Sequence, residues 1–205
     1  MLPSISFLLA ATALAIVPGP GIAYVVARTV AGGRAEGVAS SVGTAGGGMV
    51  HVLLSALGLS LLIAESPVLY SAIKYLGAAY LLYLGLKILL ARAEATDVPR
   101  VARAGAKKAF RDGIVVEALN VKTAMFFIAF IPQFVSPTHA FAPQFILLGT
   151  ICVLLNTGAD LVAVFAASRF LASEAKARRE RLLSRVSGIV MIALGLFVAL
   201  SDKHR

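Results

Sequence analysis

Residues 5–27 read ISFLLAATALAIVPGPGIAYVVA, a stretch without a single charged side chain. A helix needs about 20 mainly apolar residues to cross a hydrocarbon layer of roughly 30 Å, and this stretch is long enough. No Lys or Arg precedes it, whereas a cleaved signal peptide begins with a basic segment. We therefore expect residues 5–27 to form a retained transmembrane helix that Pro18-Gly19-Pro20 interrupts.

Further apolar blocks follow, and together they define the fold class. The chain has 205 residues, of which 59% are hydrophobic and 14% are charged, with a mean hydropathy of +0.89. That balance leaves too little polar surface to cover a water-soluble core. The sequence predicts an all-α integral membrane protein of six transmembrane helices, at 5–27, 38–64, 68–91, 113–134, 141–170 and 184–200.

The basic residues predict how the chain is oriented. The chain has 19 Lys and Arg residues and a formal net charge of +9. Of these residues, 14 lie in or beside the first, third and fifth connections, and the opposite side has Lys203 and Arg205. Cytoplasmic loops carry such an excess. We expect odd-numbered connections in the cytoplasm and both termini outside, in a bacterial inner membrane. The charges would contact anionic lipid head groups rather than nucleic acid.

The third connection, at about 92–112, divides a single transmembrane domain (residues 1–205) into two halves. The halves, at about 1–92 and 113–205, each contain three of the predicted helices. Because three is odd, the second half crosses the membrane in the opposite direction to the first. Two inverted three-helix repeats are typical of secondary transporters, whose binding sites lie near the bilayer midplane at the interface of the repeats.

Pro18-Gly19-Pro20 lies inside the first predicted helix. Each proline lacks an N–H and frees the carbonyl four residues earlier, here those of Leu14 and Ile16. Inside a bilayer such carbonyls need another partner. Two interpretations are open: a broken helix whose backbone lines a substrate cavity, or a kink whose carbonyls bond to neighbouring helices.

The fourth predicted helix carries Glu117, Asn120 and Lys122. Lys122 is about eleven residues from Arg111, or ~16 Å by helical rise, which places it near the midplane. A charge there costs at least ~2.5–3.5 kcal/mol on insertion scales, so it indicates a function and a partner. Asn120 and Lys122 are two apart, so either the helix is distorted or only one of them faces the cavity. Glu117 could instead reach Lys108 or Arg111.

The fifth predicted helix carries Asn156 and Asp160, four residues apart and therefore on one face. Asp160 could pair with Lys122 merely to satisfy both charges. A buried ion pair is a weak stabiliser, however, so function is the better reason for it. His51 in the second predicted helix is either a packing residue or a proton carrier. Lys74 in the third could extend to the outer interface or pair inward.

These polar groups lie at similar depths. By helical rise, Pro18 to Pro20, Lys122 and Asp160 each lie ~12–16 Å from the cytoplasmic edge. Backbone dipoles, a cation and an anion at one level suit a zwitterionic solute. The candidate substrate-binding or coupling residues are Pro18, Gly19, Pro20, His51, Asn120, Lys122, Asn156 and Asp160, with Glu117 and Lys74 as further candidates.

Five motifs carry a family resemblance. They are Val17-Pro18-Gly19-Pro20-Gly21, Gly43-xxx-Gly47-xxx-His51, the Tyr- and Gly-rich segment 75–85, Phe110-Arg111-xx-Gly113, and Asn120-Val121-Lys122. Over nearly its whole length the chain resembles the LysE/RhtB family of bacterial amino-acid exporters. The resemblance implies proton-driven export of amino acids or similar metabolites and leaves the substrate open. The family usually has a proline in place of Val121, so we expect a weaker helix break there.

Two other functions compete with export. An intramembrane enzyme needs a nucleophile with a base, or a metal cluster. His51 is the one histidine inside a predicted helix and Cys152 has no evident partner, so we expect no enzyme, cofactor or metal. A non-transporting subunit has no need of Lys122 and Asp160 at one depth. The expected partners are a small-molecule substrate, protons and lipids; the glycine-rich faces would permit a homodimer or serve packing within one chain.

Overall fold

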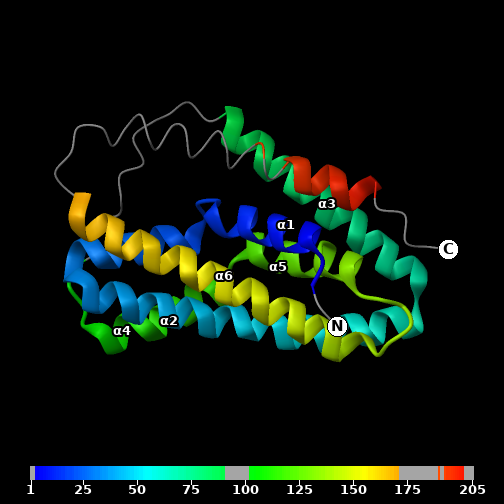
Figure 1. Cartoon of the computed structure of the whole chain (residues 1–205), viewed down its shortest axis with the longest axis horizontal. Helices are drawn as coiled ribbons and strands as arrows, with labels where there is room; N and C mark the ends of the chain where they lie inside the picture. Colours follow the sequence, from blue (N-terminus) through cyan, green and yellow to red (C-terminus); the bar gives the residue numbers. More distant parts are fainter. Residues whose placement is uncertain (1–2, 91–101, 171–188, 190–191, 201–205) are drawn as a thin grey trace.

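The computed structural model describes residues 3–90, 102–170, 189 and 192–200 of the chain. Within these residues every regular element is a helix (Figure 1). A short helical segment at 192–200 lies beside α3, where Gly195 packs on Ala78 and Leu82 (Figure 1). The named elements are α1 (Ile5–Ile16), α2 (Pro20–Glu65), α3 (Pro67–Leu90), α4 (Ala106–Ala118), α5 (Val121–Ala129), the 3-10 helix η1 (Ile131–Phe134) and α6 (Phe141–Phe170).

The first predicted helix is broken at its two prolines. Helix α1 ends at Ile16, and the Val17 N–H closes its last turn on the Leu14 carbonyl at 3.1 Å. Residues 17–19 are non-helical, and α2 begins at Pro20. A proline is tolerated there because the first N–H groups of a helix have no intrahelical partner. The interruption leaves the Val17 carbonyl open to a partner from another part of the chain.

Helix α2 folds back on itself at Gly33, which has a φ of 78° and a ψ of −173°. Residues with a side chain rarely adopt a positive φ. Arg28 and Glu36 lie on either side of the reversal and approach within 3.7 Å, whereas a straight helix would separate them by ~12 Å. We call residues 20–32 the first arm and residues 34–65 the second arm; Figure 1 shows the first arm in blue and the second in blue changing to cyan. Both arms extend into the predicted first connection.

Small residues let the second arm of α2 pack closely on α4. A Cβ atom at Gly43 would overlap the Phe110 carbonyl, and one at Gly47 would lie 2.5 Å from the Ile114 carbonyl oxygen. Gly113 of α4 in turn touches the backbone of the second arm. The glycine-rich face is therefore used for packing within one chain, and it carries no argument for a dimer.

The fourth predicted helix begins earlier than expected and is also broken. It begins at Ala106 rather than at residue 113, because the segment before Gly113 is helical but amphipathic, not apolar. A bend of 50° separates α4 from the helices that follow. Asn120 caps α5, since its side-chain oxygen accepts a hydrogen bond from the Lys122 N–H at 3.1 Å. An asparagine cap thus accompanies a full break although Val121 replaces the proline.

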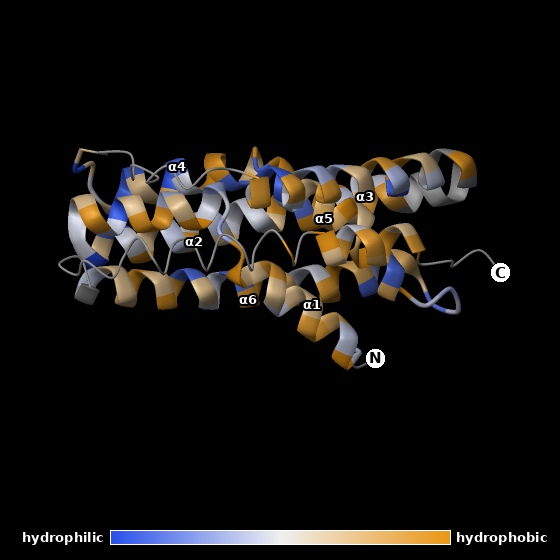
Figure 2. Cartoon of the chain, turned by 90° about the horizontal axis from the view of Figure 1, so that it is seen from above, coloured by the Kyte–Doolittle hydropathy of each residue, from blue (hydrophilic) through white to orange (hydrophobic). Residues whose placement is uncertain are grey.

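The helices agree with a membrane protein. By length and composition, Phe141–Ser168 and the stretch Pro20–Leu59, which includes the reversal at Gly33, could cross a bilayer, and the bent pair of α4 and α5 with η1 is a third candidate among the described residues. Helix α6 has its predicted bounds, and α3 differs from its prediction by one residue at each end. Of the predicted helix 184–200, residues 184–188, 190 and 191 lie outside the described part of the chain. Figure 2 shows hydrophobic residues along α3, α5 and α6 and more hydrophilic ones on α4.

An aromatic cluster fills the bundle on one side of the two breaks. The rings of Phe126 and Phe130 stack with their centroids 4.5 Å apart, and Phe7 meets Phe134 edge to face at 5.3 Å. Phe7, Phe126 and Phe127 are fully buried. Aromatic pairs add about 0.5–1.5 kcal/mol beyond the area they bury. The cluster therefore fixes α1 and α5, which border the first and the second break respectively.

Candidate functional site

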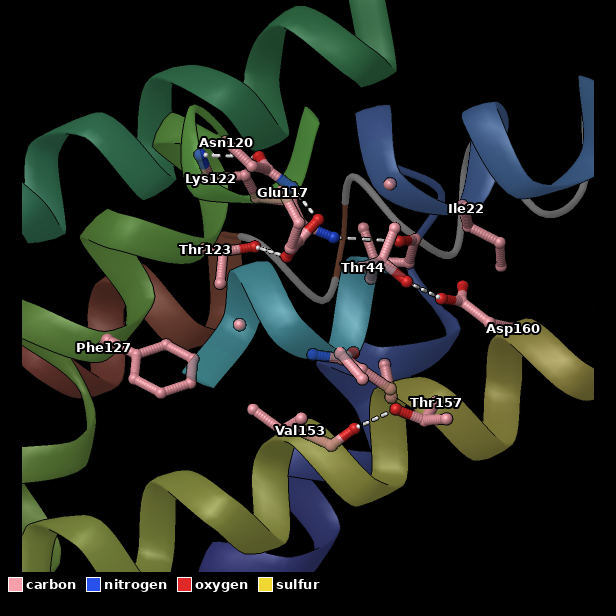
Figure 3. Close-up of a pocket in the computed structure, with 16 residues that line it drawn as sticks. Ile22, Thr44, Glu117, Asn120, Lys122, Thr123, Phe127, Val153, Thr157 and Asp160 are labelled. Atoms are coloured by element: carbon pink, nitrogen blue, oxygen red, sulfur yellow. Dashed lines mark hydrogen bonds between the residues drawn. The ribbon is translucent and has the colours of Figure 1, made fainter. Parts of the chain in front are cut away.

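A cavity of about 30 Å³ lies where the two helix breaks meet (Figure 3). That volume is room for a few water-sized molecules. Both arms of α2, the broken pair α4 and α5, and α6 each contribute polar or small residues to its wall. The polar side chains of the wall are those of Thr44, Glu117, Asn120, Lys122, Thr123, Asn156, Thr157 and Asp160.

The cavity brings together residues that the sequence predicted from separate helices. Asn120 and Lys122 both line it, because the helix is distorted between α4 and α5. Val17 and Gly21, on either side of Pro18-Gly19-Pro20, line it as well. The candidate residues found in its wall are Glu117, Asn120, Lys122, Asn156 and Asp160.

The Lys122 ammonium connects the two breaks. Its Nζ donates a hydrogen bond to the Val17 carbonyl oxygen at 3.1 Å, the backbone group that the first break leaves open. Gly19 permits this approach, since a Cβ atom there would lie 2.8 Å from Nζ. A charged side chain from the second half thus satisfies a carbonyl in the first half, inside the cavity wall.

The Glu117 carboxylate is held by two donors next to the second break. Its Oε2 accepts from the Asn120 side-chain amide at 3.0 Å, and its Oε1 accepts from the Thr123 hydroxyl at 2.6 Å. A Cβ atom at Gly21 would overlap this carboxylate, so the glycine makes room for it. The side chain therefore points into the cavity and not toward the basic residues at the start of α4.

Asp160 faces the cavity from α6. Its Oδ2 accepts a hydrogen bond from the Thr44 hydroxyl at 2.9 Å. That hydroxyl also lies 2.8 Å from the Ser41 carbonyl oxygen, and with one proton it donates to one of the two at a time. Within the described residues no salt bridge joins Asp160 to Lys122. The pairing that would merely neutralise both charges is not formed in this conformation.

The charged side chains of the cavity do not balance. One cation, Lys122, faces two carboxylic acids, Glu117 and Asp160. With all three ionised the formal charge is −1, and an unbalanced buried charge costs several kcal/mol. A proton on one acid, or the ammonium of a bound solute, would restore the balance.

His51 and Lys74 lie outside the cavity wall. The Nε2 atom of His51 lies 2.8 Å from the Glu117 backbone carbonyl oxygen, and since a carbonyl only accepts, this bond places a proton on Nε2. His51 thus holds the backbone at the end of α4, next to the second break, from outside the cavity wall. Lys74 is buried on α3, with its Nζ 5.3 Å from the Tyr75 ring centroid. In the described part of the chain no three His, Cys, Asp or Glu side chains are grouped to hold a metal ion.

Comparison with known proteins assigns the family. The sequence model of LysE type translocators matches residues 12–202. The chain belongs to the LysE type translocator family. The resemblance found from the motifs around Pro18-Gly19-Pro20 and Asn120-Val121-Lys122 is thereby confirmed.

Relatives of this translocator include proteins named for efflux. It is 28% identical over 200 residues to the homoserine/homoserine lactone efflux protein of Salmonella typhimurium, covering 97% of this chain and 96% of the relative. It is 33% identical over 155 residues to the leucine efflux protein of Salmonella typhimurium, covering 71% and 70%. An uncharacterized membrane protein of Pseudomonas aeruginosa is 31% identical over 202 residues, covering 96% and 93%. No solved structure matches the chain.

An ionic layer lies beyond the cavity of this translocator, toward the end where α2 reverses. We give this name to Tyr24, Arg28, Glu36 and Asp112. Arg28 is 4% exposed. Its guanidinium donates to Asp112 Oδ2 at 3.0 Å, to the Tyr24 hydroxyl at 3.0 Å and to the Ala102 carbonyl at 3.2 Å. The sequence treated Arg28 as a loop charge, but the structure buries it among partners from other segments.

The ionic layer joins both arms of α2 to α4. Glu36 lies 3.7 Å from Arg28, and its Oε1 accepts from the N–H groups of Ala104 and Gly105 at the start of α4. Tyr24, Arg28, Asp112 and Glu36 lie two, six, five and eight residues from the nearest cavity residue on the same helix. The aromatic cluster lies on the other side of the breaks, so the cavity lies between a charged layer and an apolar one.

Sequence reasoning missed three hydroxyl groups of the cavity wall, those of Thr44, Thr123 and Thr157. Threonine is common in membrane helices because it can bond to its own backbone, as Thr157 does to the Val153 carbonyl at 2.8 Å. Such a residue gives no signal by itself. The spacing of Glu117, Asn120 and Thr123, three residues apart each time, was the one available sign that Thr123 shares their face.

Proposed function

We propose that this translocator exports amino acids or related small metabolites across the bacterial inner membrane, driven by the proton gradient. Its membership of the LysE type translocator family and its efflux-protein relatives support export. We propose a single transmembrane domain of six spans, arranged as inverted repeats at about 1–92 and 113–205. The two facing helix breaks, one in each half, support that arrangement. The charge distribution favours cytoplasmic odd-numbered connections and external termini.

The observation that carries the proposal is that Lys122 and Asp160 line one cavity and form no salt bridge with each other among the described residues. An amino acid carries a carboxylate and an ammonium a short distance apart. Lys122, with the first N–H groups of α2, which have no intrahelical partner, would bind the carboxylate. Asp160 would bind the ammonium. Neither charge needs the other once the solute is present, which accounts for two costly charges at one depth.

The same geometry favours Asp160 as the coupling group. Both oxygens of Glu117 accept donors from its own broken helix, and His51 is engaged by a backbone carbonyl. Thr44 is the hydrogen-bond partner of Asp160 among the described residues. A carboxylate that holds a proton cannot also hold an ammonium ion pair. Exchange of the two at Asp160 would therefore couple solute export to proton entry.

Efflux from loaded cells tests the proposal. Cells expressing the protein are loaded with a panel of labelled amino acids and dipeptides, and release is followed with and without a protonophore. We expect release of one substrate class that exceeds release from cells with an empty vector and fails with protonophore. Release that persists undiminished with protonophore would contradict proton coupling. Release of no member of the panel would contradict the amino-acid assignment, and untargeted metabolite profiling would then follow.

Export also requires the ionic layer to open, since it lies on the proposed cytoplasmic side of the cavity. Glu36→Gln retains an oxygen for the N–H groups of Ala104 and Gly105 but loses the charge facing Arg28. Loss of one partner from a buried ion pair costs about 3–5 kcal/mol, so the open state should gain at least ~10-fold in population. The population of the open state can be measured through the reactivity of a cysteine that replaces the cavity residue Thr157, in a Cys152→Ala background.

We expect a small cationic thiol reagent, applied to inside-out vesicles, to label that cysteine at least ~10-fold faster when Glu36→Gln is present. The matched control is Arg34→Gln, which removes a charge near the same end. Arg34 bonds to the Ser168 hydroxyl and is not part of the ionic layer. Equal labelling rates in all three proteins would show that the layer is not the barrier.

A further inference from the structure

A basic groove lies on the exposed face of α4, separate from the cavity. It has a volume of about 690 Å³. Lys107, Lys108 and Arg111 line it on the side where α4 begins, and Ile114 and Val115 line it further along the helix. All three basic residues are exposed. The proposed export path uses none of these side chains.

The groove has an unbalanced positive charge. Asp112 is the acidic residue in its wall, and the Asp112 carboxylate is occupied by Arg28 at 3.0 Å. Within the described residues Lys107, Lys108 and Arg111 form no salt bridge. Three exposed cations on two adjacent turns therefore lack a counter-ion, and together they would attract a phosphate or another anion.

The same face becomes apolar toward the end of α4, from Val115 in the groove wall to Leu119, the residue that caps the helix. Val115 is 56% exposed and Leu119 is 74% exposed. By helical rise they lie ~6 Å and ~12 Å beyond Arg111, toward the second break. A free anion in solution would gain nothing from these two side chains. A phospholipid would place its head group on the cations and an acyl chain along the apolar residues.

We propose that this groove is a binding site for one anionic phospholipid. Lys107, Lys108 and Arg111 bind the head group, and Val115 and Leu119 contact an acyl chain. A zwitterionic phospholipid binds more weakly, because its own cation offsets the attraction. The site lies on α4, whose Asp112 belongs to the ionic layer, so the lipid contacts a helix of that layer.

Native mass spectrometry of the purified full chain in detergent tests the site. Phosphatidylglycerol and phosphatidylcholine with the same acyl chains are added at equal concentration, and inorganic phosphate is added in a separate arm. We expect one retained phosphatidylglycerol, and on the order of 100-fold weaker binding in Lys107→Gln/Lys108→Gln/Arg111→Gln, at about fivefold per basic residue. A single Lys107→Gln variant gives a graded loss without threatening the fold, since the residue is exposed.

The matched control is Arg178→Gln/Arg179→Gln/Arg181→Gln, which removes the same formal charge from a different connection. Retained binding in this control, together with loss in the groove variants, supports the site. Equal loss in both would show a diffuse electrostatic attraction and overturn it. Equal retention of both lipids, or displacement of the lipid by inorganic phosphate, would also overturn it. The assay involves no transport, so its result is independent of the proposed export.

Discussion

We expect Asp160→Asn to abolish proton-driven export and to leave the protein folded. The change keeps the size of the side chain and keeps an oxygen that accepts from the Thr44 hydroxyl, now at 2.9 Å from Oδ2. It removes the one carboxylate of the cavity that is not held by two donors. The variant can neither take up a proton nor form an ion pair with an ammonium, so accumulation against a gradient should fall to the level of the empty vector.

The measurement is the ratio of external to internal labelled substrate in cells, with membrane levels and elution from a size-exclusion column checked for each variant. Thr44→Val should give a ratio of external to internal substrate between those of the wild type and Asp160→Asn, because a hydrogen bond to a charged group contributes about 1.5–3 kcal/mol. That range corresponds to a change of roughly 10- to 150-fold in the strength of the interaction with Asp160.

Two further variants separate Asp160 from the other titratable groups. Glu117→Gln and His51→Gln should lower the amount of folded protein, because both side chains support the second break. The protein that does fold should still respond to protonophore. Full export by Asp160→Asn would remove this residue from the mechanism. Loss of the protonophore response in Glu117→Gln would transfer the coupling role to that residue.

The sequence predicted an interruption at Pro18-Gly19-Pro20 for a simple local reason, and left open whether it was a break or a kink. Pro18 and Pro20 lack N–H groups, and no tertiary contact is needed to know that a helix cannot continue regularly through both. The bounds of α6 were equally predictable, because that helix is mainly apolar and Asn156 and Asp160 are isolated polar residues within it. The start of α4 was not, since residues 106–112 are amphipathic and a search for apolar blocks passes over them.

The contacts of the site could be predicted only in part. Depth along each helix placed Lys122 and Asp160 at one level, and both line the cavity. The depth of a residue along a helix does not give the direction in which its side chain points. On a regular helix Asn120 and Lys122 would lie on opposite faces, whereas the bend of 50° between α4 and α5 lets both line the cavity. The ionic layer could not be predicted from the sequence for another reason. Arg28 and Glu36 become neighbours only when Gly33 reverses α2, and charged residues between apolar blocks are usually loop residues.

Lys122→Met is the second change for which we expect a large effect. Methionine keeps an unbranched side chain of similar length and removes the ammonium that would bind the solute carboxylate. Truncating one partner of a buried charged contact costs about 2–5 kcal/mol, so export should fall by at least ~30-fold. Initial rates of efflux at several internal substrate concentrations should show this mainly as a higher KM, because the lost contact is to the bound solute.

A structural role of Lys122 has to be separated from a role in binding. Its Nζ also holds the Val17 carbonyl at 3.1 Å, so the two breaks could separate when it is lost. Lys122→Arg keeps the charge and a donor, and it should recover part of the export. Lys87→Met removes a membrane lysine from α3, where its Nζ lies 5.9 Å from the Tyr83 ring, and it should export normally.

Gly19→Ala gives a third test, because it alters the position of the ammonium without removing it. The added Cβ would lie 2.8 Å from Nζ and 3.0 Å from Cε, so the flexible end of Lys122 must shift. If Lys122 binds the solute, this shift should raise KM several-fold while the protein folds normally. If Lys122 only closes the contact between the two breaks, Lys122→Met should lower the amount of folded protein, and the fraction that folds should export with an unchanged KM.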